Sequence, residues 1–143
     1  MSLSNLLFLK EVAFDSMMVF EGKSVPIYSA KNEINRIAKL YFFSIKEYRK
    51  LVRKELILKN KIPIYFSKSL LLFCVKSKDE VYWINYFKIL KICFGEKVVI
   101  FFMDGSFIEV EVSRQVLSKE IKKVNVVLDY INNLWNDSVF IDG

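Results

Sequence analysis

The sequence of 143 residues contains no histidine, only four glycines, two prolines and two cysteines. Without histidine the chain lacks the commonest general base and metal ligand near neutral pH, and no Ser-His or Cys-His nucleophile can form. Cys74 and Cys93 are too far apart in the sequence to form the C-x-x-C pair of a zinc site. The few glycines form no phosphate-binding loop of the G-x-G-x-x-G or Walker type. We therefore predict a protein that is not an enzyme and that has no cofactor and no metal.

Long apolar runs are also absent. The two longest, residues 70–75 and 98–103, are far shorter than the roughly 18 residues that cross a bilayer. The N-terminus has no cationic start before an apolar segment, so a secretory signal is not expected. We predict a cytoplasmic protein that does not enter membranes, in which both cysteines are buried and reduced.

The residues that are present favour one folded domain that spans residues 1–143. A hydrophobic content of 53% and an aromatic content of 15% exclude intrinsic disorder. The net charge is +6, but residues 31–68 hold eleven Lys and Arg against three acids, a balance of +8, while the rest of the chain has a balance of −2. A positive excess confined to one segment is typical of proteins that bind a polyanion, either nucleic acid or an acidic membrane surface.

Residues 31–58, which carry this excess, have the pattern of an amphipathic helix. Apolar residues recur at spacings of three and four from Ile34 to Leu56, as they do on a helix with one buried face. A break near Ser44 is expected within this long segment. On its second half the cations project from the face opposite the apolar stripe.

From residue 62 to residue 113 the pattern changes to that of a sheet. Asp104-Gly105 lies between two β-rich runs and predicts a two-residue type I′ hairpin, which pairs Phe101 with Ile108. One strand face would then be core, and Phe102 and Phe107 would lie on the other, half-polar face. The residues predicted for the core face are Val99, Phe101, Met103, Ile108, Val110 and Val112.

The C-terminal segment predicts a helix over about residues 114–135. Its apolar residues repeat at spacings of four and three from Leu117 to Trp135, which forms a narrow stripe that must pack on something. We expect it to pack on the sheet rather than on a second subunit. The predicted fold class is α+β: a mostly antiparallel sheet with an amphipathic helix in the N-terminal half and a C-terminal helix packed on it.

Six blocks follow one another along the chain: YFFSIKEYRK (41–50), KIPIYFS (61–67), SLLLFCVKS (69–77), VYWI (81–84), IFFMDGSFIEVEVS (100–113) and the helix from Arg114. Their order and spacing resemble the competence transcription factor (ComK) family of low-GC Gram-positive bacteria. The chain departs from the family at Phe73-Cys74-Val75, where a Pro and a Thr are missing. It also has helix-favouring residues in place of the family's glycine-containing pattern around Ser44, and it is shorter than full-length members.

The resemblance implies a cytoplasmic DNA-binding transcriptional activator that binds AT-rich double-stranded promoter DNA through the minor groove. It also implies a homo-oligomer and control by an adaptor and a protease. On this interpretation, five cations of the helical segment bind backbone phosphate, because guanidinium and ammonium groups suit that role, and three C-terminal lysines are secondary contacts. These residues are Lys46, Arg49, Lys50, Arg53 and Lys54, followed by Lys119, Lys122 and Lys123.

Three other interpretations of the basic segment stay open at this point. It can be a solvated helix face with no ligand. It can belong to a protein-interaction module that modulates a full-length relative. It can also bind anionic lipid headgroups, in which case the protein should prefer anionic vesicles to DNA.

Overall fold

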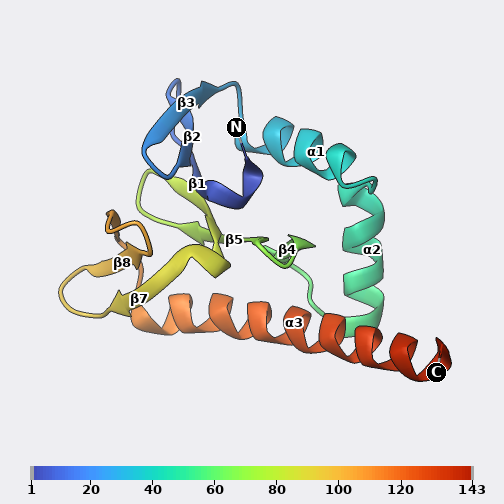
Figure 1. Ribbon diagram of the computed structural model, residues 1–143. Helices are drawn as coiled ribbons and strands as arrows, with labels where there is room; N and C mark the ends of the chain where they lie inside the picture. Colours follow the sequence, from blue (N-terminus) through green and yellow to red (C-terminus); the bar gives the residue numbers. More distant parts are fainter. Residues whose placement is uncertain (1, 143) are drawn as a thin grey trace.

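The structure is a computed structural model that describes residues 2–142, and the side chains of residues 2–134. Figure 1 shows the chain. The elements in chain order are β1 (Leu6–Glu11), β2 (Ser16–Phe20), β3 (Lys23–Ile27), α1 (Ala30–Leu40), α2 (Ile45–Leu56), β4 (Ile64–Ser67), β5 (Leu70–Lys76), β6 (Val81–Asn85), β7 (Ile89–Cys93), β8 (Val98–Phe102), β9 (Phe107–Val110) and α3 (Arg114–Asp142). Two short 3-10 turns, Leu3–Asn5 and Tyr86–Lys88, precede β1 and β7.

The strands form two antiparallel sheets, which confirms the α+β fold class. The larger sheet has the order β3-β2-β1-β6-β5-β4, and the smaller has the order β7-β8-β9. Helices α1 and α2 contribute to the hydrophobic cluster on one face of the larger sheet. The smaller sheet and α3 contribute to the cluster on its other face. The larger sheet is therefore the middle layer of the molecule.

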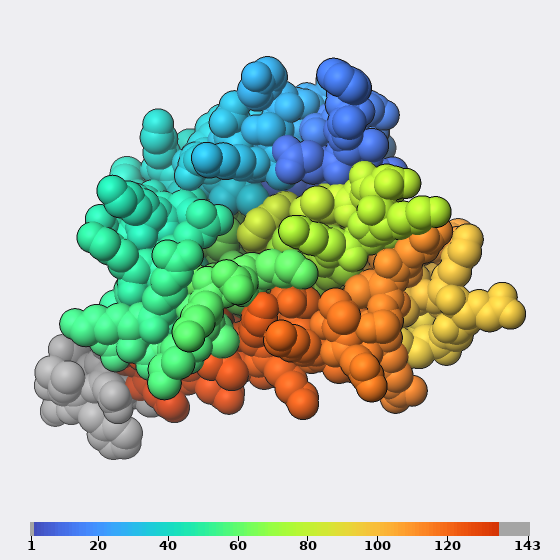
Figure 2. Space-filling view, turned by 180° about the vertical axis from the view of Figure 1, so that it is seen from behind, coloured from blue at the N-terminus to red at the C-terminus, as the bar shows by residue number. Residues whose placement is uncertain are grey.

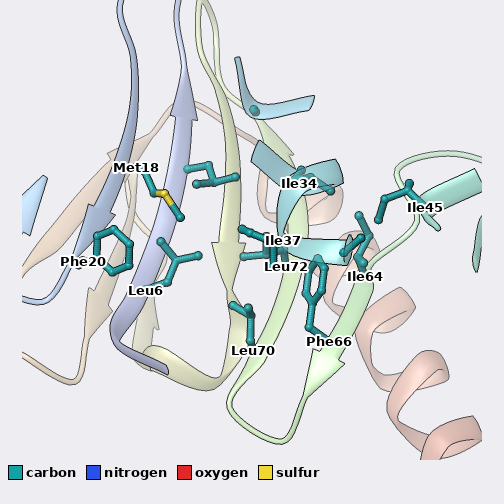
Figure 3. Close-up of a cluster of buried hydrophobic side chains, with 13 residues drawn as sticks. Leu6, Met18, Phe20, Ile34, Ile37, Ile45, Ile64, Phe66, Leu70 and Leu72 are labelled. Carbon is teal, nitrogen blue, oxygen red and sulfur yellow. The ribbon is translucent and has the colours of Figure 1, made fainter. Parts of the chain in front are cut away.

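Burial on both faces explains the longest apolar runs. In β5, residues 70–75 are all buried. Leu70 and Leu72 pack under the helices, as Figure 3 shows, whereas Leu71 and Phe73 face the smaller sheet. An antiparallel strand with two covered faces loses the polar alternation of a half-exposed strand.

The sheet begins much earlier in the sequence than residue 62. Strands β1, β2 and β3 were not predicted, and β1 pairs with β6, far along the chain. Residues 6–9 are all buried because both faces of β1 are covered: Leu6 and Leu9 pack on the helix side, and Leu7 and Phe8 on the other. An irregularity between Leu6 and Phe8 puts the neighbours Leu7 and Phe8 on the same side of the sheet. A bulge of this kind hides the period of two on which sequence-based prediction of a strand depends.

The predicted break near Ser44 is confirmed. Helix α1 ends at Leu40, and the side chain of Ser44 caps α2 by accepting a hydrogen bond from the N–H of Glu47 at 3.4 Å. Between the helices, Phe42 has a φ of +63° and a 96% exposed side chain. A left-handed residue cannot continue an α-helix, so the chain turns here.

The β8–β9 hairpin exists, but its predicted register and turn type are wrong. Phe101 pairs with Phe107, and Ile100 pairs with Ile108. The N–H of Phe102 donates to the carbonyl of Ser106, and that of Gly105 to the carbonyl of Phe102, at 2.9 and 3.0 Å. Within this described loop Gly105 has a φ of +91° but Asp104 has no positive φ, whereas a type I′ turn needs two such residues.

The loop has three residues where two were predicted, so the buried and exposed faces of β8 are the reverse of the predicted ones. Phe102, predicted to face outward, is fully buried, and Met103, predicted to be core, is 60% exposed. On β9 the prediction holds, since Val110 is buried and Phe107 is exposed. A shift of one residue in register moves each side chain to the opposite face of its strand.

Helix α3 begins at Arg114, as predicted, and continues to Asp142. Leu117 and Val124 are fully buried in the cluster between the larger and the smaller sheet, where Ile121 and Leu128 also pack. This confirms packing on the sheets for the stripe from Leu117 to Leu128. The side chain of Trp135 lies outside the described residues.

Both cysteines are free, but only Cys74 is buried. Burial raises the pKa of the Cys74 thiol to about 11. Cys93 is exposed near the end of β7, an outer strand of the smaller sheet, so its predicted burial is wrong.

Candidate nucleic-acid interface

Two adjoining hollows lie between the helices α1 and α2 and the sheet face that they partly cover. The upper hollow has a volume of about 730 Å³ and the lower hollow about 370 Å³, and they share Glu11, Arg49, Arg53 and Trp83. We call them together the basic groove. Figure 2 looks onto this face, which is hollowed between the helices at the left and the yellow-green strands at the right. Eight cations line it: Lys31, Lys46, Arg49, Lys50, Arg53, Lys59, Lys61 and Lys76.

Helix α2 supplies half of these cations. Ile45 and Val52 are buried, and this fixes the rotation of the helix about its axis. Lys46, Arg49 and Arg53 then follow one another at spacings of three and four, so they lie along one flank. That flank lines the groove.

The floor of the groove is an uncovered part of the larger sheet. Trp83 pairs with Leu9 on one side and with Cys74 on the other, so its side chain shares their face. It is half-buried and packs against the cluster under α1 and α2. Towards the end of the strands, Glu11 and Lys76 both pair with Val81 and complete the floor.

The segment between α2 and β4 brings Lys59 and Lys61 to the lower hollow. It begins with Ile57 in the left-handed conformation at a φ of +56°, and Lys61 has a φ of +48°. Arg53 Nε donates to the carbonyl of Lys59 at 3.4 Å, and Lys123 Nζ donates to the carbonyl of Asn60 at 2.8 Å. The loop is therefore held from both α2 and α3.

The electrostatics of the basic groove are one-sided. Glu11 is the single acidic residue among its lining residues, and its Oε1 accepts a hydrogen bond from the N–H of Ala30, at the start of α1, at 3.1 Å. Among the residues that the structure describes, none of the eight cations forms an ion pair. Charges of one sign in a concave site reinforce one another and attract counter-ions. The groove is therefore suited to an anionic ligand.

Of the predicted site residues, Lys46, Arg49, Lys50 and Arg53 line the basic groove, whereas Lys54 is exposed on α2 outside it. Lys119 and Lys122 border a separate shallow hollow beside Arg114 on α3. Lys123, predicted as a secondary phosphate contact, has a side chain that is 14% exposed and pairs with Glu120 at 3.1 Å. It holds the Lys59–Lys61 loop instead.

The sequence-based prediction missed Lys31, Lys59, Lys61 and Lys76 as members of one site. The first three lie in the basic segment, so the local charge excess contained a signal for them. Lys76 and Trp83 carried no such signal, because only the pairing of β5 with β6 brings them next to α2.

Tyr48 anchors α2 beside the groove and provides a test of that anchoring. Its hydroxyl donates to the carbonyl of Pro63 at 2.6 Å and accepts from the N–H of Tyr65 at 3.2 Å. Burial raises the pKa of Tyr48 to about 12. A raised phenol pKa gives stability that is full below the unfolded pKa, near 10, and is lost as the pH rises towards 12.

We therefore expect the free energy of unfolding to fall by about 2 kcal/mol more in the wild type than in Tyr48→Phe between pH 9 and 12. Urea unfolding at a series of pH values measures this difference. The pKa of Tyr82 is raised too, by burial first, but that residue is present in both proteins, so its contribution cancels. Parallel pH curves would show that Tyr48 is not buried in solution.

Comparison of the chain with protein-family models, curated proteins and solved structures gave no significant match. In the described residues there is no helix whose length and apolarity would let it cross a membrane. The same part of the chain contains no cluster of three or more Cys, Asp or Glu side chains arranged to hold a metal ion.

Proposed function

We propose that this protein binds nucleic acid through the basic groove and acts as a DNA-binding transcriptional regulator of the competence transcription factor type. The observation that carries the proposal is the gathering of eight cations from four parts of the fold around one concave surface with a single carboxylate. Phosphates contacted by Lys and Arg account for most of the non-specific affinity of DNA-binding proteins. AT-rich promoter DNA is the preferred ligand on the evidence of the sequence resemblance alone.

Concavity favours nucleic acid over a lipid surface. A membrane is flat on the scale of this groove, so only the residues at its rim could contact headgroups. Arg49 is instead half-buried in a hollow about 730 Å³ in volume, which a flat surface does not enter. A phosphodiester backbone can enter such a hollow, and guanidinium groups bind its oxygens with two hydrogen bonds.

The test is fluorescence anisotropy of the purified protein with an AT-rich and a GC-rich duplex, from about 50 to about 300 mM salt. We expect binding that weakens steeply with salt, because bound cations release counter-ions from the DNA. We also expect the preference for the AT-rich duplex to persist at high salt, because shape and bendability do not depend on ionic contacts.

Three results would contradict the proposal in different ways. Equal binding to both duplexes that disappears with salt would leave only a cationic surface. Tighter binding to anionic vesicles than to DNA would support the lipid interpretation. Binding to neither would support a protein-interaction module. The expected homo-oligomer and the adaptor and protease partners stay predictions of the resemblance.

A further inference from the structure

We propose that the strand in the basic groove is unpaired DNA, and that one of its bases stacks on Trp83. This inference rests on the proposed function, because it specifies the form in which the nucleic acid occupies the same groove. It draws on two features of the groove: the size of its two hollows, and Trp83, which lines both of them.

The shape restricts what can enter. The upper hollow has a volume of about 730 Å³ and the lower about 370 Å³. These volumes are in the range of clefts that bind small molecules, about 300–1,000 Å³, and both hollows open to solvent on one side. Sugar, phosphate and base from one strand fit a space of this size, whereas a duplex could only lie across the mouth of the groove.

The floor provides a stacking surface. Trp83 belongs to both hollows, so a strand that passes from one to the other crosses it. Bases of a duplex are covered on both faces by their neighbours, and a base must leave the stack before an aromatic side chain can contact its face. An unpaired strand presents free faces, and base–aromatic stacking tolerates any sequence.

The cations surround this surface on several sides. Arg49 and Arg53 of α2 are shared by both hollows, Lys31 of α1 lies in the upper one, and Lys61 and Lys76 lie in the lower one. Phosphates of a bound strand would therefore meet cations on either side while its bases turn towards the sheet. A basic groove that follows the backbone, combined with aromatic side chains, is the general design of proteins that bind single strands.

This arrangement also fits the expected preference for AT-rich DNA. Pyrimidine–purine steps such as TA are the most easily unstacked steps of a duplex. An AT-rich site would then yield an unpaired segment to the groove at a lower cost than a GC-rich site. The ligand in the groove is the same whether the strand is supplied free or is opened from a duplex.

The test uses Trp135→Phe, which leaves Trp83 as the sole tryptophan, because the chain has two. The probe is a short oligodeoxythymidylate, compared with a duplex that contains the same strand. We expect the single strand to quench Trp83 fluorescence and to bind at least tenfold more tightly than the duplex. In the full chain, Trp83→Ala should weaken single-strand binding about tenfold, and Trp83→Phe much less, since a phenyl ring still stacks.

Circular dichroism and thermal unfolding of Trp83→Ala show whether the variant keeps its fold, and the fluorescence experiment does not need that variant. Single-strand binding without a change in Trp83 emission would overturn the inference, as would tighter binding of the duplex. In both cases, the proposed function would still be supported if replacing Arg49, Lys50 and Arg53 by alanine weakened binding. No binding of either probe would overturn both.

Discussion

Replacement of Arg49, Lys50 and Arg53 together by alanine is expected to weaken nucleic-acid binding about a hundredfold at low salt and to flatten its salt dependence by about two to three slope units. All three line the upper hollow of the basic groove, and none of them forms an ion pair with a described residue. Each phosphate contact that is lost removes about 0.7 to 0.9 of a unit from the slope of log K against log salt. Anisotropy titrations over a range of salt concentrations measure both quantities.

The matched control removes the same charge elsewhere. Lys23, Lys39 and Lys78 are exposed and do not line the groove, and their replacement by alanine changes the net charge by the same amount. We expect this control to shift affinity by no more than a few fold, because distant exposed charges are screened at moderate salt. Equal losses in the two triple variants would show that binding depends on net charge and not on the groove.

A second large effect is expected for Phe102→Ala, which should lower the free energy of unfolding by about 3–5 kcal/mol. Phe102 is fully buried, and its ring stacks on that of Phe8 at a centroid distance of 5.5 Å. Alanine would leave a cavity between the smaller sheet and the larger one. Chemical denaturation followed by circular dichroism measures the loss.

Phe101→Ala is the matched control, because it removes the same atoms from the next residue of β8. The Phe101 ring is half-buried and contacts Phe107 and the ammonium group of Lys91 on the outer face, at 5.7 and 5.0 Å. We expect a loss of about 1 kcal/mol from these contacts. A larger loss at Phe101 than at Phe102 would favour the type I′ register that the Asp104-Gly105 pair predicts.

Features set by neighbouring residues could be predicted. The break at Ser44 depends on a local cap, and the start of α3 and the orientation of its stripe depend on a helical period. The two strands around Gly105 were predicted as well, since turn residues and β-branched runs are local signals. The register of these strands could not be predicted, because turns of two and of three residues both accept Asp-Gly. The choice between the two turns depends on which phenylalanine fits under the larger sheet.

The candidate site was predictable in composition but not in shape. The charge excess of residues 31–68 identified α2, and four of its five predicted cations line the groove. Lys123 was misassigned because helical spacing alone cannot show that a side chain turns back to the Asn60 carbonyl. Trp83 packs on the core and also forms the groove floor.

The sequence by itself determined that the chain folds with a large core, that it combines helices with antiparallel strands, and that its positive charge is concentrated in one segment. These properties depend on composition and on spacings of a few residues. Only the tertiary structure decided which faces of β1, β5 and β8 are buried, and that Glu11, Arg49 and Trp83 meet in one groove. Such contacts join residues far apart in the chain, and their free energy depends on how whole layers pack. A pattern of neighbouring residues carries no information about that packing.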